Sequence, residues 1–277
     1  MTGSALTSMW AWDNPVPASV DGRGRDYGPA EPAQLVAFCA DRGIGRVFLS
    51  APWAADEGPV GSWFGAAVAA LQTAGVQVSP LGGDPGWLNQ PSLALTWALA
   101  ALRSAPCPTI QLDIEPWATP QWATDRDHLC RQWLALLDLV RAGLPAGVGL
   151  GLDAPWWLAH ERHPDDPDAT LLSAVLSRAD RVGIVAFSDH AQGPDGIVSL
   201  AAPAVVAASA AGRPFTVGVE TDTAAVAGGA QYTFVDEGPA VLETETALVR
   251  DAFDQLPGYE GVTVEHHRAW RRLLGLD

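Results

Sequence analysis

The chain of 277 residues contains no lysine, and all 16 of its basic residues are arginine. Lysine chemistry is therefore excluded: there is no Schiff-base lysine for a carbonyl substrate or pyridoxal phosphate, no lysine general base and no P-loop lysine. The arginines are scattered, and the formal net charge is −16. Because no basic cluster or basic helix is present, we expect neither nucleic acid nor an anionic membrane surface as a partner.

Cysteine and long apolar runs are also scarce. Cys39, Cys107 and Cys130 show no CxxC or Cys/His spacing, and an odd, sparse set favours buried thiols in a reducing compartment over a disulfide framework. The first residues lack a basic region followed by an apolar run, and no apolar stretch reaches 18 residues. We therefore expect no signal peptide, no transmembrane helix and a cytoplasmic location.

Eight short apolar runs alternate with helical patterns along the chain. We expect strands at 8–12, 46–50, 76–81, within 109–117, and at 148–153, 181–187, 215–220 and 261–267. The expected helices are 32–41, 62–74, 92–103, 125–142, 168–179, 198–211, 239–255 and a short one at the end of the chain. Apolar strands that alternate with helices indicate a parallel sheet covered by those helices.

Eight such units in this length predict an α/β fold, a single (β/α)8 TIM barrel, with residues 1–277 as one domain. A doubly wound open sheet is the structural alternative. Such a sheet usually carries a glycine-rich turn after its first strand, but here that turn is Asp13-Asn14-Pro15, which cannot bind a pyrophosphate. The barrel is favoured.

The stretch 109–117 (TIQLDIEPW) contains two carboxylates, Asp113 and Glu115, spaced i, i+2. In a strand, residues at this spacing point to the same face. Neighbouring carboxylates raise each other's proton affinity, which allows one of them to act as an acid near neutral pH. The alternative is a pair of separately solvated side chains at an exposed strand end.

In a barrel, the active site is built at the carboxyl ends of the strands. Most of the 12 tryptophans and many carboxylates fall at these predicted ends. The predicted substrate-binding residues are Trp12, Asp13, Trp53, Asp84, Trp87, Trp117, Asp153, Trp156, His190, His266 and Trp270. Roles as core tryptophans and helix-capping aspartates would explain any one position but explain the whole set poorly. Aromatic faces stack on sugar rings, and carboxylates bind hydroxyls and protonate glycosidic oxygens, so the pattern favours a carbohydrate pocket.

Glu115 after the fourth strand and Glu220 after the seventh resemble the two glutamates of the retaining clan A barrel glycoside hydrolases. The resemblance implies that Glu115 is the acid/base and Glu220 the nucleophile, with Trp270 as the aromatic residue near the eighth strand. Ile114 departs from it, since that group usually has asparagine there.

The spacing Asp113-x-Glu115 also resembles the end of the chitinase motif DxxDxDxE, in which the glutamate is the acid and the aspartate assists it. The earlier aspartates of that motif are absent from 109–111. The stretches LDIEPW, VGVET and HH..W are similar to those of bacterial TIM-barrel proteins to which no activity is attached here.

We therefore expect a glycosidase-type hydrolase that acts on a small glycoside or polar metabolite without a cofactor or metal. Glu115 is the expected general acid/base, Asp113 the group that tunes it, and Glu220 the nucleophile or second carboxylate. One alternative is a magnesium enzyme, because Asp84, Glu115 and Asp153 match the ligand positions of enolase-type barrels. A sugar-isomerase-like metal site with His190 or His266, a barrel redeployed for cyclisation, elimination or isomerisation of a non-sugar metabolite, and a binding-only barrel also remain open.

Overall fold

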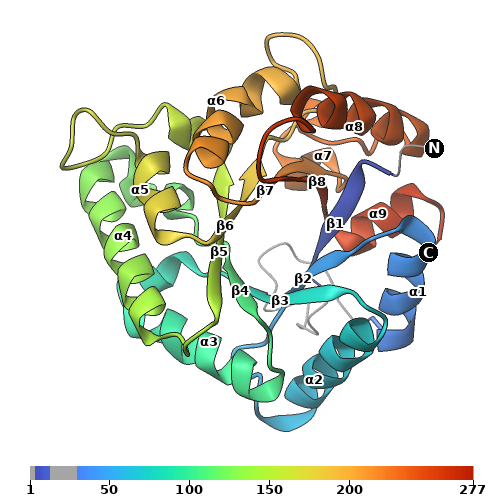
Figure 1. The fold of residues 1–277 in the computed structure, drawn as a ribbon, viewed down its shortest axis with the longest axis horizontal. Coiled ribbons are helices and arrows are strands. Elements are labelled where there is room, and N and C mark those ends of the chain that lie inside the picture. The colour runs from blue at the N-terminus through green and yellow to red at the C-terminus, as the bar shows by residue number, and fades with distance from the viewer. Residues whose placement is uncertain (1–3, 13–29, 277) are drawn as a thin grey trace.

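The computed structural model of the protein describes residues 4–12 and 30–276. Eight parallel strands pair in chain order from β1 to β8, and β8 pairs with β1 to close the barrel (Figure 1). The strands are β1 (Leu6–Ala11), β2 (Arg46–Ser50), β3 (Gln77–Gly82), β4 (Thr109–Leu112), β5 (Gly149–Pro155), β6 (Arg181–Val185), β7 (Phe215–Glu220) and β8 (Tyr259–Glu265). The prediction of a (β/α)8 barrel is confirmed.

The helices form an outer ring around the strands (Figure 1). They are α1 (Pro32–Arg42), α2 (Gly58–Thr73), α3 (Pro91–Ser104), α4 (Arg126–Gly143), α5 (Leu171–Arg178), α6 (Ile197–Ala210), α7 (Ala224–Ala227), α8 (Pro239–Phe253) and α9 (His267–Leu273). Proline occupies the first turn of α1, α2, α3 and α8, where its missing N–H is not needed. Gly43 ends α1 at φ 71°, a left-handed conformation that glycine adopts without strain.

Short 3-10 helices follow three of the strands and were not predicted. They are η1 (Pro85–Leu88), η2 (Pro116–Ala118), η3 (Pro120–Ala123), η4 (Trp156–Ala159) and η5 (Ala230–Tyr232), of which η5 follows α7. The predicted strand that contains Asp113 and Glu115 is also corrected, because β4 ends at Leu112 and both carboxylates lie in the loop after it. Asp13 lies outside the described residues.

The interior of the barrel is largely polar near the amino ends of its strands. Ser8, Thr263 and Thr216 form a chain of hydroxyl hydrogen bonds of 2.6 and 2.7 Å. Arg181, 7% exposed, pairs with Glu260 at this end. The main apolar core instead lies between the strands and the helices. These polar side chains fill the barrel at the amino ends of the strands, so a site can form only at the carboxyl ends.

Trp10 fills the upper part of the barrel interior, where it packs against Phe48 and Leu81. Two glycines on the facing strands make room for its indole ring. A Cβ on Gly218 would lie 2.7 Å from the ring, and one on Gly183 would lie 3.2 Å from it. Since real Cβ atoms essentially never come within 3.0 Å of such atoms, glycine is needed at position 218 to admit the tryptophan, whereas at position 183 a Cβ would meet the Asp153 carboxylate at 2.4 Å.

The three cysteine thiols are all buried and unbonded to one another. Burial raises the pKa of Cys39 and of Cys107 to about 12, so these thiols are protonated and inert. Within residues 4–12 and 30–276, no helix combines the length and the apolar character that crossing a membrane requires.

Candidate active site

A cavity of about 210 Å³ opens at the carboxyl end of the barrel and is lined by acidic side chains. We call it the acidic well. Its carboxyl groups belong to Asp113, Glu115, Asp153, Glu220 and Glu265. Trp10, Val185, Phe187, Val226 and Ala227 complete its lining, and no basic side chain is among the described residues there. The site therefore gathers carboxylates against an apolar wall, as acid/base chemistry requires.

The loop after β4 brings Asp113 and Glu115 to the well together. Ile114 between them is 1% exposed and packs in the core, so its two neighbours are directed away from the core. The N–H of Asp113 donates to the carbonyl of Gly82 at 3.0 Å, which extends the β3–β4 pairing by one residue. Asp113 is half-buried, whereas Glu115 is exposed at the rim. Pro116 then starts η2 and turns the chain outward.

Asp153 lies on β5 at the floor of the well and is 3% exposed. Its carboxylate accepts hydrogen bonds from Gln111 Nε2 at 2.8 Å and from Trp10 Nε1 at 3.1 Å. Burial raises the pKa of Asp153 to about 7, although these two donors and Arg181 favour the charged form. The negative charge of Glu115 raises it further. Asp153 is therefore a buried carboxyl that gains and loses its proton near neutral pH, within the electrostatic influence of Glu115.

Glu220 and Glu265 end β7 and β8 and are direct partners in the strand register. Both are nearly buried, at 4% and 8% exposed. Glu220 Oε1 accepts hydrogen bonds of 2.8 Å from the backbone N–H groups of Thr221 and Asp222. These two donors fix the orientation of the Glu220 carboxylate on the wall of the well.

Behind this wall, Asp222 and His266 form a fully buried pair with 3.0 Å between Oδ2 and Nε2. Arg272 approaches the other oxygen of Asp222 at 3.4 Å. The Thr221 hydroxyl donates a hydrogen bond of 2.7 Å to the carbonyl of Glu265. The peptide bond between Glu265 and His266 is cis. These contacts join the ends of β7 and β8 and hold the backbone that orients Glu220.

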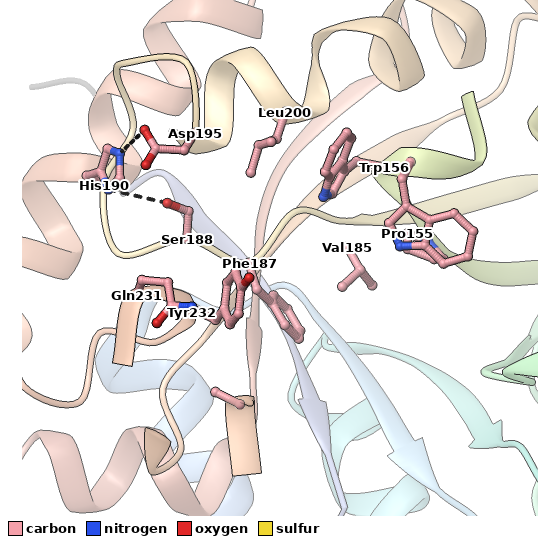
Figure 2. A pocket seen from close by; sticks show the side chains of 12 residues that line it. Pro155, Trp156, Val185, Phe187, Ser188, His190, Asp195, Leu200, Gln231 and Tyr232 are labelled. Atoms are coloured by element: carbon pink, nitrogen blue, oxygen red, sulfur yellow. Dashed lines mark hydrogen bonds and ion pairs between the residues drawn. The ribbon is translucent and has the colours of Figure 1, made fainter. Parts of the chain in front are cut away.

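A second cavity of about 500 Å³ adjoins the acidic well and shares Val185, Phe187 and Ala227 with it. We call it the aromatic groove (Figure 2). Its other lining residues are Pro155, Trp156, Trp157, Ser188, His190, Asp195, Leu200, Gln231 and Tyr232. They come from the loop after β5, the loop after β6, helix α6 and the segment around η5.

His190 stands at one end of the groove between two aspartates. Its Nδ1 lies 2.5 Å from Asp189 Oδ1, and its Nε2 lies 3.2 Å from Asp195 Oδ1. The hydrogen bond to Asp189 raises the pKa of His190 above its usual value, against partial desolvation and with a smaller contribution from Asp195. The Ser188 hydroxyl lies 3.3 Å from the same Nδ1. Asp189 thus occupies, at the shorter distance, the same nitrogen that would have to take a proton from Ser188, so His190 is not free to act as the base for a serine nucleophile.

Six of the residues predicted from the sequence line these two cavities. Asp113, Glu115, Asp153 and Glu220 meet in the acidic well, and Trp156 and His190 line the aromatic groove. Trp12 lies beside the well in the small cluster of Trp10, Phe48 and Leu81.

The other predicted residues lie elsewhere. Asp84 is exposed and caps η1 by accepting from Gly86 N at 2.7 Å. Trp87 packs on Trp97 and on the 51% exposed Trp53. The three residues Trp117, His266 and Trp270 pack against Trp157, Asp222 and Phe38, respectively. The 3-10 helices after β3 and β4 explain part of this outcome, because they turn Trp87 and Trp117 onto the outer helices.

Several lining residues were not among the predicted site residues. Trp10 and Glu265 fall at predicted strand ends, so their position was a usable signal. Phe187 is the last residue of the predicted strand 181–187 and carried the same signal, whereas Leu200 and Tyr232 carried none, because they come from α6 and η5, which only the fold brings to the groove.

The magnesium alternative requires Asp84, Glu115 and Asp153 to lie together. Glu115 and Asp153 line the acidic well, but Asp84 does not, because its carboxylate accepts a hydrogen bond within its own loop. Among residues 4–12 and 30–276, no set of three or more His, Cys, Asp or Glu side chains is placed to hold a metal ion.

Comparisons with known proteins extend the description of the fold. No family model matches the chain, and no curated protein matches its sequence. Solved structures do match. They include a GH18 chitinase from Pseudoalteromonas aurantia (14% identity, TM-score 0.60, 98% of each chain) and a chitinase from Rhizomucor miehei (14%, 0.59, 98% of each). The spore cortex-lytic enzyme SleL of Bacillus cereus matches over all of this chain and 75% of its own (10%, 0.58). At these identities the likeness concerns the fold.

Proposed function

We propose that this protein is a hydrolase of the glycosidase type, with its reaction centre in the acidic well. The observation that carries the proposal is the meeting of five carboxyl side chains, from the loop after β4 and from β5, β7 and β8, in a cavity of about 210 Å³. That volume lies below the roughly 300–1,000 Å³ of a site for a drug-sized ligand, so it suits about one sugar ring. Solved chitinases and a cortex-lytic enzyme with the same fold support this class of reaction.

In the proposed reaction, Glu115 is the general acid. Its proton passes to the glycosidic oxygen as the bond to the anomeric carbon breaks, and the leaving group departs as a neutral alcohol. If Glu220 is a nucleophile, its oxygen bonds to the anomeric carbon as the leaving group departs, and water then replaces it there and gives a proton back to Glu115. If Glu220 is a base, water bonds to the anomeric carbon directly and gives its proton to Glu220, and Glu115 is reprotonated from solvent. Glu115 is exposed and lines the well, so a leaving-group oxygen at the mouth of the well can reach it.

Glu220 is the proposed second carboxylate, held in place by the N–H groups of Thr221 and Asp222. It acts either as a nucleophile or as a base that activates water. The configuration of the first product, read by proton NMR, distinguishes the two roles: retention supports a nucleophile and inversion supports a base. Asp113 and Asp153 are proposed to tune the proton affinity of Glu115.

The test is a screen of 4-methylumbelliferyl glycosides that differ in their sugar, with the purified wild-type protein. We expect release of the fluorescent aglycone from at least one sugar and its loss in Glu220→Gln. A matched control is Glu243→Gln, because Glu243 is exposed on α8, away from the lining of the well. Tight binding of a glycoside without turnover would support a binding-only barrel and reject the proposed reaction.

A further inference from the structure

We infer that the aromatic groove binds the leaving group of the substrate and that this group is a neutral aromatic aglycone rather than a further sugar. The inference rests on the proposed function, since it assigns the reacting sugar to the acidic well. It adds the chemical class of the other half of the substrate.

The walls of the groove are apolar over most of its length. Trp156, Phe187, Leu200 and Tyr232 contribute ring and aliphatic surfaces from four separate segments of the chain. In Figure 2, Trp156, Val185 and Leu200 lie together on one side of the cavity. Such surfaces bind a flat aromatic ring through apolar burial and through ring–ring contact.

The polar groups of the groove gather at its other side, where Ser188, His190 and Asp195 lie (Figure 2). The loop that carries them is held from two directions. The N–H of Ala191 donates to Glu245 Oε2 at 2.7 Å, and the N–H of Asp189 donates to the carbonyl of Gln231 at 3.1 Å. A fixed polar edge opposite an apolar wall matches an aromatic ring with one hydrogen-bonding substituent at its far edge.

The groove and the well adjoin, because Val185, Phe187 and Ala227 line both of them. We therefore assign the two halves of one substrate to the two cavities, with the glycosidic oxygen where their linings meet. The groove alone, at about 500 Å³, falls within the usual size of a site for a small organic ligand.

A sugar ring would fit this groove less well because it carries hydroxyl groups around most of its edge. Each hydroxyl that leaves water without a new hydrogen-bond partner costs free energy. The polar lining at one side can satisfy only part of such a ring, whereas an aryl group leaves few polar atoms to satisfy.

The experiment uses Leu200→Gln, which replaces an apolar wall of the groove by an amide. Its matched control is Val206→Gln on the same helix, α6, where Val206 is 57% exposed. Calorimetric titration of both variants and of the wild type with free 4-methylumbelliferone measures aglycone binding without turnover. We expect Leu200→Gln to weaken binding about tenfold, the size of losing one apolar side-chain contact, and Val206→Gln to match the wild type.

A second measurement compares a 4-methylumbelliferyl glycoside with the disaccharide of the same sugar. We expect kcat/KM of the wild type to favour the aryl glycoside and Leu200→Gln to lose this preference. Equal effects of both substitutions on aglycone binding, or a preference for the disaccharide, would overturn the inference. Aglycone binding without hydrolysis of any glycoside would instead leave the groove assigned and reject the proposed function.

Discussion

The indole N–H of Trp10 on β1 donates a hydrogen bond of 3.1 Å to the carboxylate of Asp153 on β5, across the interior of the barrel. The contact joins strands on opposite sides of the closed sheet and sets the floor of the acidic well. The same hydrogen bond holds the buried carboxyl of Asp153 in the well, where the negative charge of Glu115 contributes to its raised pKa.

Asp153→Asn is expected to change how stability depends on pH. The folded-state pKa of about 7 lies above the ordinary value of 3.8, so between these pH values the folded state binds more protons than the unfolded state. The wild type therefore loses stability as pH rises from 4 to 7, and asparagine removes that loss. The gain of the variant at pH 8 relative to pH 4 is at most roughly 4 kcal/mol, since one pKa unit corresponds to about 1.4 kcal/mol.

Thermal unfolding of both proteins from pH 4 to pH 8 measures this difference. The control is Asp168→Asn, because Asp168 is exposed in the loop before α5 and its own side chain cannot impose a burial penalty. A melting-temperature difference between Asp153→Asn and the wild type that stays constant across the range would show that Asp153 does not titrate as described.

Gly218→Ala is expected to destabilise the protein by about 1–3 kcal/mol, the usual cost of an extra methyl group in a packed interior. The new Cβ would lie 2.7 Å from the Trp10 ring, which is itself enclosed by Phe48 and Leu81. Gly45→Ala is the control, because its nearest atom would be 4.0 Å away. Denaturant unfolding compares the two variants, and equal stabilities would contradict the described packing of Trp10.

His190 is expected to titrate above its usual pKa of about 6.5, chiefly because of Asp189. Asp189→Asn should lower this pKa, and Asp195→Asn should lower it by less, since Asp195 is the smaller contributor. The His190 contribution to stability is then fully present below the unfolded-state pKa and is lost as pH rises through the folded-state pKa. NMR titration of the imidazole protons measures the shift; a larger effect of Asp195→Asn would reverse the assignment of partners.

Much of the fold and part of the site followed from the sequence. The strand β2 and the strand β7 were predicted with their observed bounds, because short apolar runs between turn residues are strong local signals. The rule that barrel sites lie at carboxyl ends of strands then brought Asp113, Glu115, Asp153 and Glu220 to one cavity.

The directions of the tryptophan side chains could not be predicted from the sequence. Trp87 and Trp117 stand five residues after the ends of β3 and β4 and Trp156 directly follows β5, and of these three Trp156 lines one of the two described cavities. Their directions depend on the 3-10 turns after each strand and on the helices that cover them, and these are tertiary contacts without a local signature. For the same reason, the sequence did not predict that Leu200 of α6 and Tyr232 of η5 line the groove.

The measurement that tests the central claim most directly compares Glu115→Gln with the wild type on two aryl glycosides of one sugar, the phenyl and the 2,4-dinitrophenyl derivatives. A general acid matters most for the phenyl glycoside, because phenol leaves poorly without a proton. We predict a loss of kcat/KM of roughly 100- to 10,000-fold for the phenyl glycoside and a much smaller loss for the dinitrophenyl glycoside. Equal losses on both substrates, or activity on the phenyl glycoside within about tenfold of the wild type, would contradict the role of Glu115 as the acid.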